Sequence, residues 1–155
     1  MKAGIMVDAL SMSQQSFNII KELNKLSKID RYIDVILFYH RYDRYPVTPY
    51  FAMLQEQEVW GFDGPIIATN ILSVERLIKC PSPKDKYFYI WDLEWIYNPY
   101  FKYKYLRSIY QNESIKLIAR SESHLNIIEK CWKKPVGILE DFNHEQLIKI
   151  FDRSS

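Results

Sequence analysis

The sequence predicts an α/β protein with a three-layer, Rossmann-like fold, in which helices cover both faces of a mostly parallel sheet. Short apolar, β-branched segments alternate along the chain with segments whose apolar residues recur every three to four positions. The short segments are apolar almost throughout, which is typical of strands covered on both faces. With 155 residues, 48% of them apolar, the chain can bury one such core. We therefore expect a single Rossmann-like domain over residues 1–155.

The first part of the chain predicts strands and one helix in alternation. Residues 2–8 (KAGIMVD) predict a short buried strand, and an apolar stripe within residues 14–26 predicts the helix after it. Residues 33–39 (IDVILFY) and 65–69 (PIIAT) predict the next two strands. Between them, residues 50–60 fit either a short strand or a helical turn.

The middle of the chain continues the alternation. Asn70 or Ser73 is expected to cap a short helix that ends at Lys79. Residues 87–91 (YFYIW) predict a strand. The Asn-Pro dipeptide before residues 100–110 predicts a helix there, because proline suits the first helical turn.

The last part adds two strands and two helices. Residues 116–119 and 136–139 predict strands, and residues 121–132 predict a helix between them with a serine as its cap. Asn143 begins a final amphipathic stretch, and Gln146 stands at the spacing of a capping box.

The charge balance does not support nucleic acid as a partner. The chain carries 21 basic and 19 acidic side chains and a net charge of +2, too balanced to predict binding to DNA or to an anionic membrane. No apolar run approaches the ~18 residues of a membrane span, and the N-terminal residues lack the features of a signal peptide. We expect no membrane partner and a cytoplasmic location.

No cofactor and no metal are expected. The glycine-rich motifs GxGxxG and GxxxxGK[ST] are absent, and so is GxSxG. His40, His124 and His144 lie too far apart for metal-ligand spacing. Cys80 and Cys131 have apolar neighbours, as small buried hydrophobes do, and a disulfide or zinc site is the alternative.

Polar residues follow several expected strands, where the carboxyl edge of a parallel sheet binds ligands. The expected ligand-binding residues are Asp8, Ser11, Ser13, Asp92, Glu94, Trp95, Arg120, Ser121 and His124. Further strand-end polar residues are Asn70, Ser73, Ser123, Glu140, Asp141 and Asn143. Helix caps use the same residue types for structural reasons, and this alternative stays open. No catalytic residue is assigned, although Asp92 and Glu94 suit a general acid and base; otherwise Asp92 caps a turn and Glu94 is solvated.

Residues 88–106 (FYIWDLEWIYNPYFKYKYL) are rich in aromatic side chains. Residues 88–91 fit a core strand. Phe101, Tyr105 and Ile109 are expected to face inward from the helix that follows. Trp95 and Tyr97 fall in the loop between, where core packing explains them least. They suit stacking on a sugar ring or a base, or a protein interface. The interface interpretation uses Trp95, Tyr97, Tyr103, Arg107 and Tyr110, and the last three are expected to share an exposed face of the helix.

The order of these segments resembles the N-terminal, acceptor-side half of a GT-B type glycosyltransferase. The segments that carry the resemblance are KAGIMVDALSMSQQSFNIIKELNKL, PIIATNILSVERL, KYFYIWDLEW, and LIARSESHLNIIEKCW before VGILEDF. It implies an acceptor over the carboxyl edge of this domain and a nucleotide-sugar donor held mainly by a second domain. The sequence matches the acceptor-side half alone, so a stand-alone half domain is expected. Its Lys- and Ile-rich composition is similar to that of phage-encoded chains.

Two functions follow from this resemblance and the residues together. The first is a binding or interaction module, with a homo-oligomer or a partner subunit formed through the aromatic segment. The alternative is a glycosyltransferase subunit that transfers sugar from a nucleotide-sugar donor and needs a second domain or a partner chain. The expected ligand is a sugar or a nucleotide in either case.

Overall fold

The computed structural model describes residues 2–29 and 32–152 and contains one seven-stranded, fully parallel sheet. The expected α/β fold with a Rossmann-like three-layer arrangement is confirmed. The strands are β1 (Lys2–Leu10), β2 (Asp34–Tyr42), β3 (Ala52–Gln55), β4 (Ile66–Ala68), β5 (Lys86–Ile90), β6 (Ile115–Ala119) and β7 (Gly137–Ile138). The helices are α1 (Gln14–Ile29), the 3-10 helix η1 (Glu56–Gly61), α2 (Ile71–Lys79), α3 (Glu94–Tyr97), α4 (Tyr103–Tyr110), α5 (Glu122–Cys131) and α6 (His144–Asp152).

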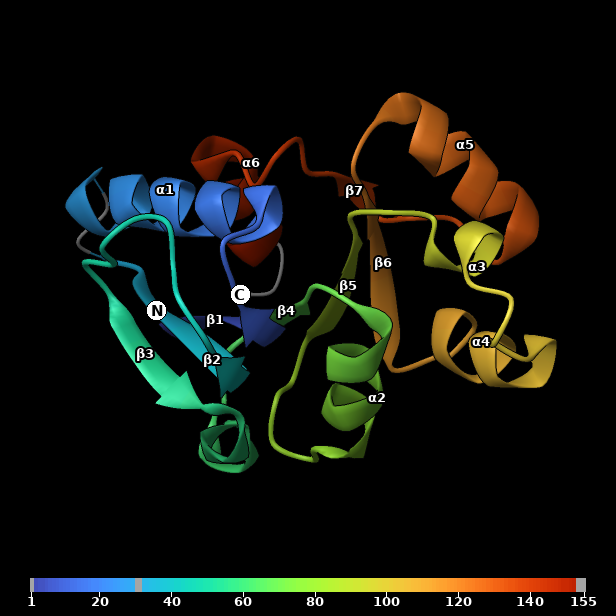
Figure 1. The fold of residues 1–155 in the computed structure, drawn as a ribbon, viewed down its shortest axis with the longest axis horizontal. Coiled ribbons are helices and arrows are strands. Elements are labelled where there is room, and N and C mark those ends of the chain that lie inside the picture. The colour runs from blue at the N-terminus through green and yellow to red at the C-terminus, as the bar shows by residue number, and fades with distance from the viewer. Residues whose placement is uncertain (1, 30–31, 153–155) are drawn as a thin grey trace.

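The strand order is β3-β2-β1-β4-β5-β6-β7, so the direction of winding reverses between β1 and β4. Two apolar cores follow from this winding. One core lies between the sheet and helices α1 and α6, and the other lies between the sheet and helices α2, α4 and α5. Figure 1 shows α1 beside α6 on one side of the sheet, with α2 and α4 on the other. Every strand therefore has its carboxyl end at the same edge of the sheet.

Side chains at the helix starts explain several boundaries. The Asn70 side chain accepts a hydrogen bond from the Ser73 amide, and the Ser73 hydroxyl accepts one from the Asn70 amide, which completes a capping box. Ser13 accepts from the Ser16 amide at the start of α1, and Ser121 accepts from the His124 amide at the start of α5. Polar residues after the strands thus begin the helices, as expected from their cap propensity.

Two stretches differ from the expectation. Residues 50–60 contain both alternatives, because β3 pairs with β2 and η1 follows directly. The helix expected over residues 100–110 begins only at Tyr103, and the short helix α3 precedes it. Asn98 explains this, since its side chain accepts from the Tyr100 amide and closes a turn around Pro99. Pro99 therefore belongs to a turn between two helices.

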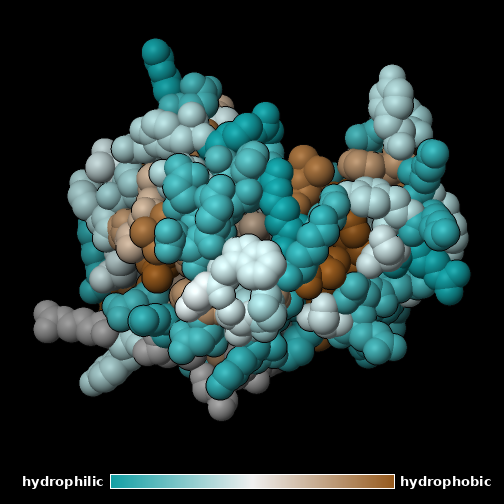
Figure 2. All heavy atoms as spheres, turned by 90° about the horizontal axis from the view of Figure 1, so that it is seen from below, coloured by the Kyte–Doolittle hydropathy of each residue, from teal (hydrophilic) through white to brown (hydrophobic). Residues whose placement is uncertain are grey.

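Within the described parts of the chain, no helix has the length and apolar character needed to cross a membrane. Figure 2 views the molecule from the side that is lower in Figure 1, where its hydrophobic residues form separate patches among hydrophilic ones.

Candidate functional site

The predicted site residues divide into two groups along the carboxyl edge. Asp92 and Glu94 follow β5, and Arg120, Ser121 and His124 follow β6, so these five come from neighbouring strands. Asp8 lies on β1, which β4 and β5 separate from β6. Three strand spacings of about 4.8 Å make roughly 14 Å between β1 and β6. The structure therefore brings the second half of the predicted site together and leaves the first half apart.

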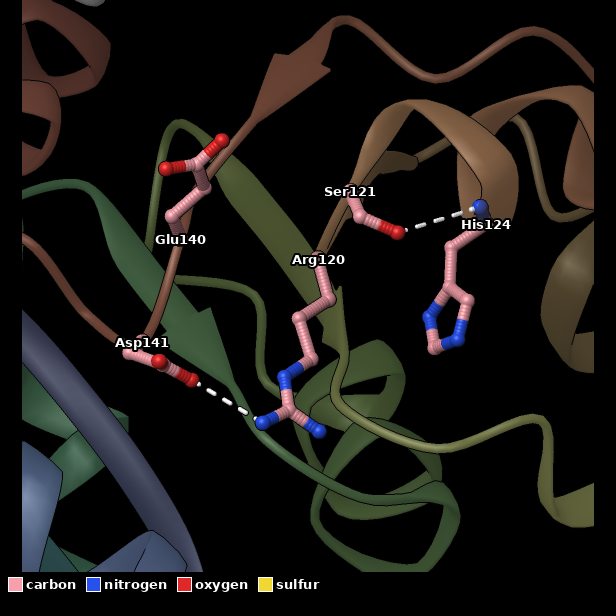
Figure 3. A pocket seen from close by; sticks show the side chains of 5 residues that line it. All are labelled: Arg120, Ser121, His124, Glu140 and Asp141. Carbon is pink, nitrogen blue, oxygen red and sulfur yellow. Dashed lines mark hydrogen bonds and ion pairs between the residues drawn. The ribbon is translucent and has the colours of Figure 1, made fainter.

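A first hollow, which we name the Arg120 hollow, lies between the ends of β6 and β7. It has a cavity volume of about 320 Å³ and is lined by Arg120, Ser121, His124, Glu140 and Asp141. In Figure 3 the side chains of Arg120 and His124 extend in the same direction, while the Glu140 carboxylate points away from the guanidinium. Glu140 and Asp141 were not among the expected ligand-binding residues, although they follow the last expected strand.

The Arg120 guanidinium is held from two sides. Its central carbon lies 3.8 Å from the centroid of the Trp91 ring, and its Nη2 donates to Asp141 Oδ1 at 3.0 Å. Stacking on an aromatic face fixes the plane of the guanidinium and leaves its remaining N–H groups directed to the side. Arg120 is thus a preorganised donor rather than a freely moving surface charge.

The turn after β7 places two consecutive residues in the left-handed region. Asp141 has a φ of 47° and Phe142 has a φ of 62°, and neither is glycine. Left-handed backbone costs about 1–2 kcal/mol for a residue with a side chain. The Phe142 ring is fully buried and lies 4.5 Å from the Tyr89 ring centroid. Burial of this ring holds the strained turn in place, and the turn directs Asp141 toward Arg120.

Two polar atoms at this site are buried without a hydrogen-bond partner. They are the Tyr89 hydroxyl and His124 Nδ1, and no group in the described part of the chain forms a hydrogen bond with either atom. Burial lowers the pKa of His124, the Arg120 charge lowers it further, and Asp92 opposes both. Native structures rarely leave such groups unpaired, so each needs an explanation. Tyr89 was missed by sequence reasoning, since a tyrosine within an apolar strand is indistinguishable from a core residue.

A second hollow, which we name the Tyr97 hollow, opens next to Asp92. Its cavity volume is about 730 Å³. Its lining residues are Asp92, Glu94, Tyr97, Asn98, Pro99 and Tyr100. Both tyrosine rings are largely exposed, at 78% for Tyr97 and 90% for Tyr100. The hollow therefore combines oxygen acceptors with aromatic surfaces that are open to solvent.

Glu94 is the most perturbed carboxyl of the site. Burial, and then the neighbouring negative charge of Asp92, raises its pKa to about 7, against a hydrogen bond from the Ile71 backbone. Ile71 is the first residue of α2, so Glu94 connects the Tyr97 hollow to the helix that follows β4. A carboxyl that titrates near neutral pH can accept or donate a proton under physiological conditions.

Glu94→Gln is expected to stabilise the protein by about 2 kcal/mol at pH 8 and to have little effect at pH 4. A carboxyl whose folded pKa is raised binds its proton more tightly in the folded state, so stability falls as pH rises from about 4.5 to 7. Glutamine removes this loss and keeps an oxygen for the Ile71 amide. Urea unfolding at both pH values measures the change in the free energy of unfolding, with Glu122→Gln on the surface of α5 as control. An equal effect at both pH values would contradict the raised pKa.

The three remaining ligand-binding candidates at β1 have other structural roles. Asp8 is 5% exposed, and its carboxylate accepts from Arg41 Nη2 at 2.6 Å and from Arg76 Nη1 at 2.8 Å. The Ser13 hydroxyl caps α1, and the Ser11 amide donates to the Ser16 hydroxyl. These groups are already paired, and they lie apart from both hollows.

The interface interpretation needs one correction. Tyr110 was expected on an exposed face, but it is fully buried because Trp132 stacks on it at 5.0 Å and Trp95 meets it edge-on at 4.9 Å. Trp95 belongs to α3 rather than to a loop, and it packs against the second core. Tyr97 and Tyr103 are exposed, and so is Arg107. The aromatic stretch is thus mainly a core element with a few exposed rings.

Metal ligation finds no support in the described residues, where no three side chains of His, Cys, Asp or Glu gather closely enough to hold an ion. Cys80 is buried and Cys131 is exposed, and both are free thiols. No known family model matches the chain, and no curated protein matches it.

Proposed function

We propose that this chain is a glycosyltransferase-like binding domain that holds a carbohydrate in the Tyr97 hollow. The observation that carries the proposal is the convergence of carboxylate and amide oxygens with exposed aromatic rings in one hollow at the carboxyl edge of the sheet. Sugars present hydroxyl donors around their rim and apolar C–H groups on their faces. Acceptor oxygens and aromatic rings match these two kinds of surface.

The charge of the hollow favours a sugar over a nucleotide. Asp92 and Glu94 are its two charged side chains, and both are acidic. A nucleotide diphosphate would meet these carboxylates, and Arg120 of the neighbouring hollow is already paired with Asp141. Carboxylates instead accept hydrogen bonds from hydroxyl groups, and such charge-assisted bonds are among the stronger ones.

The position of the hollow in the fold agrees with a ligand site. In open parallel sheets, ligands bind outside the carboxyl ends of the strands near the point where the winding reverses. Glu94 reaches the start of α2, the helix that follows β4 at this point. A volume of about 730 Å³ lies within the range of pockets that hold small molecules.

A second candidate function is sugar transfer, and the raised pKa of Glu94 is the observation that favours it. A carboxylate with a pKa of about 7 can remove the proton from an acceptor hydroxyl as the hydroxyl oxygen attacks the anomeric carbon of a nucleotide-sugar, whose bond to the nucleotide diphosphate breaks so that the diphosphate leaves. A second domain or a partner subunit would supply the nucleotide-sugar donor. Under this function Glu94→Gln abolishes transfer but retains sugar binding, which separates it from the binding function.

The test of the proposed function is a titration of the protein with a panel of monosaccharides and nucleotide-sugars, in which NMR or calorimetry measures binding. We expect Tyr97→Ala and Asp92→Asn each to weaken sugar binding about tenfold, since each removes one ring or one charged acceptor, about 1.4 kcal/mol. Tyr32→Ala is the matched control, because Tyr32 is an exposed tyrosine just before β2, away from the hollow. If no sugar binds at millimolar concentration, or if both variants bind as the natural protein does, the proposal fails.

A further inference from the structure

We propose that the Arg120 hollow binds one anionic group, a carboxylate or a phosphate, and that this group belongs to the sugar held in the neighbouring Tyr97 hollow. The ligand class is then an acidic sugar or a sugar phosphate. The anion site is argued below from its own residues. Its connection to a sugar rests on the proposed function.

The Arg120 hollow offers N–H donors, whereas the charged groups of the Tyr97 hollow are acceptors of hydrogen bonds. Arg120 has five N–H donors, and the structure shows one bond from its side chain, to Asp141. Its guanidinium is fixed on Trp91, and His124 lines the same hollow. Bidentate recognition of carboxylate and phosphate is the chemistry that a fixed guanidinium performs best.

The start of α5 adds donors to the same hollow. Ser121 caps this helix of 10 residues, and its hydroxyl accepts a hydrogen bond from the His124 amide. The preceding amides of the first turn have no acceptor within the helix, because intrahelical bonds begin one turn later. They also lie at the positive end of the helix dipole, which favours an anion.

The Tyr89 hydroxyl is an independent sign of a ligand. Tyr89 is fully buried, and its hydroxyl has no hydrogen-bond partner in the described part of the chain. The Asp141 amide approaches it without hydrogen-bonding geometry, and the charges of Arg120 and Asp92 act on its pKa, which burial raises. The charges of residues that line both hollows thus reach the hydroxyl, which is an O–H donor without an acceptor in the described part of the chain. A bound anion would supply that acceptor.

The carboxylates nearby limit the ligand to a single acidic group. Glu140 points away from Arg120 (Figure 3). Asp141 occupies one side of the guanidinium, but its side chain is 59% exposed, and surface ion pairs of this kind contribute little. An incoming anion can replace Asp141 or bind to the other edge of the guanidinium. A second anionic group would meet Asp92, so polyanions fit poorly.

The test compares four probes by calorimetry and NMR: glucose, glucuronate, glucose 6-phosphate and inorganic phosphate. An acidic sugar is expected to bind at least tenfold more tightly than glucose. Tyr89→Phe and Arg120→Gln should reduce this preference to about twofold or less. Tyr103→Phe, on the exposed face of α4, is the matched control and should keep the preference.

Tyr89→Phe also separates a binding role from a structural one. Because the hydroxyl has no hydrogen-bond partner among the described residues, its removal should leave the melting temperature unchanged or raise it, while weakening the binding of the acidic sugar. Equal affinity for acidic and neutral sugars, or an unchanged preference in both variants, would overturn the inference and leave the proposed function standing. Binding of inorganic phosphate without any sugar would support the anion site and reject the proposed function. A preference for glucuronate or for the phosphate identifies which acidic group is recognised.

Discussion

Phe142→Ala is expected to lower the free energy of unfolding by about 3–5 kcal/mol, the usual cost of deleting a fully buried phenylalanine. The Phe142 ring has no exposed surface and packs edge-on against Tyr89 at 4.5 Å and parallel to Trp91 at 6.1 Å. Its removal leaves a cavity beneath the turn after β7. It also removes the support that holds this residue in the left-handed region, at a φ of 62°.

Urea unfolding followed by far-UV circular dichroism measures this loss. Phe17→Ala is the matched control, because Phe17 is a 39% exposed phenylalanine on α1, and we expect it to cost about 1 kcal/mol or less. Trp91 packs against Phe142 and supports Arg120, so Phe142→Ala should weaken anion binding as well. A destabilisation of Phe142→Ala no greater than that of Phe17→Ala would show that this ring does not hold the turn.

Arg76→Met is expected to cost about 2–3 kcal/mol at pH 7. Arg76 joins α2 to β1 and η1, since its Nη1 lies 2.8 Å from Asp8 Oδ1 and 3.1 Å from Glu56 Oε2. Methionine keeps the aliphatic stem, so the packing loss is small. Asp8 would remain buried with Arg41 as its partner, and the Arg41 side chain is 67% exposed. Leaving a buried carboxylate with part of its compensation removed is destabilising.

The cost of Arg76→Met should shrink in acid. Burial acts to raise the pKa of Asp8, but hydrogen bonds from Arg41 and Arg76 and their charges outweigh it, so the pKa is lowered. The stabilisation is therefore complete above the unfolded pKa of about 3.9 and is lost as pH falls through the lower folded value. Lys79→Met, at an exposed pair on the same helix, is the control and should change stability by less than about 0.5 kcal/mol. A difference between Arg76→Met and the natural protein that stays constant from pH 7 to pH 3 would contradict this account.

Sequence reasoning located most of the elements because strands and helices leave local patterns. The continuous apolar runs at β1, β2 and β5 and the stripe of α1 follow from the periodicity of each structure. The caps at Asn70 and Ser121 follow from local chemistry as well. The delayed start of α4 was not predicted, because the turn at Asn98 and the proline at the first position of a helix share one sequence signature.

The candidate site was predicted in part. Polar residues after β5 and β6 were found because strand ends carry a simple signal, and the same signal also selected Asp8, Ser11 and Ser13. The structure shows that Asp8 is neutralised by two arginines from β2 and α2, which are distant in sequence. Tyr110 was placed outside because its helix face contains Tyr103 and Arg107, but Trp132 from beyond α5 covers it.

The sequence by itself determined the alternation of buried strands and amphipathic helices, and with it the edge of the sheet where polar side chains gather, because these properties depend on neighbours within a few positions along the chain. The tertiary structure alone decided which of those side chains stand together, since the strand order separates β1 from β6 by two strands. It also decided that the Tyr89 hydroxyl is buried with no hydrogen-bond partner among the described residues, at a place where the Arg120 charge acts on its pKa. Burial and pairing depend on residues that are far apart in the sequence, and they are fixed only when the chain has folded.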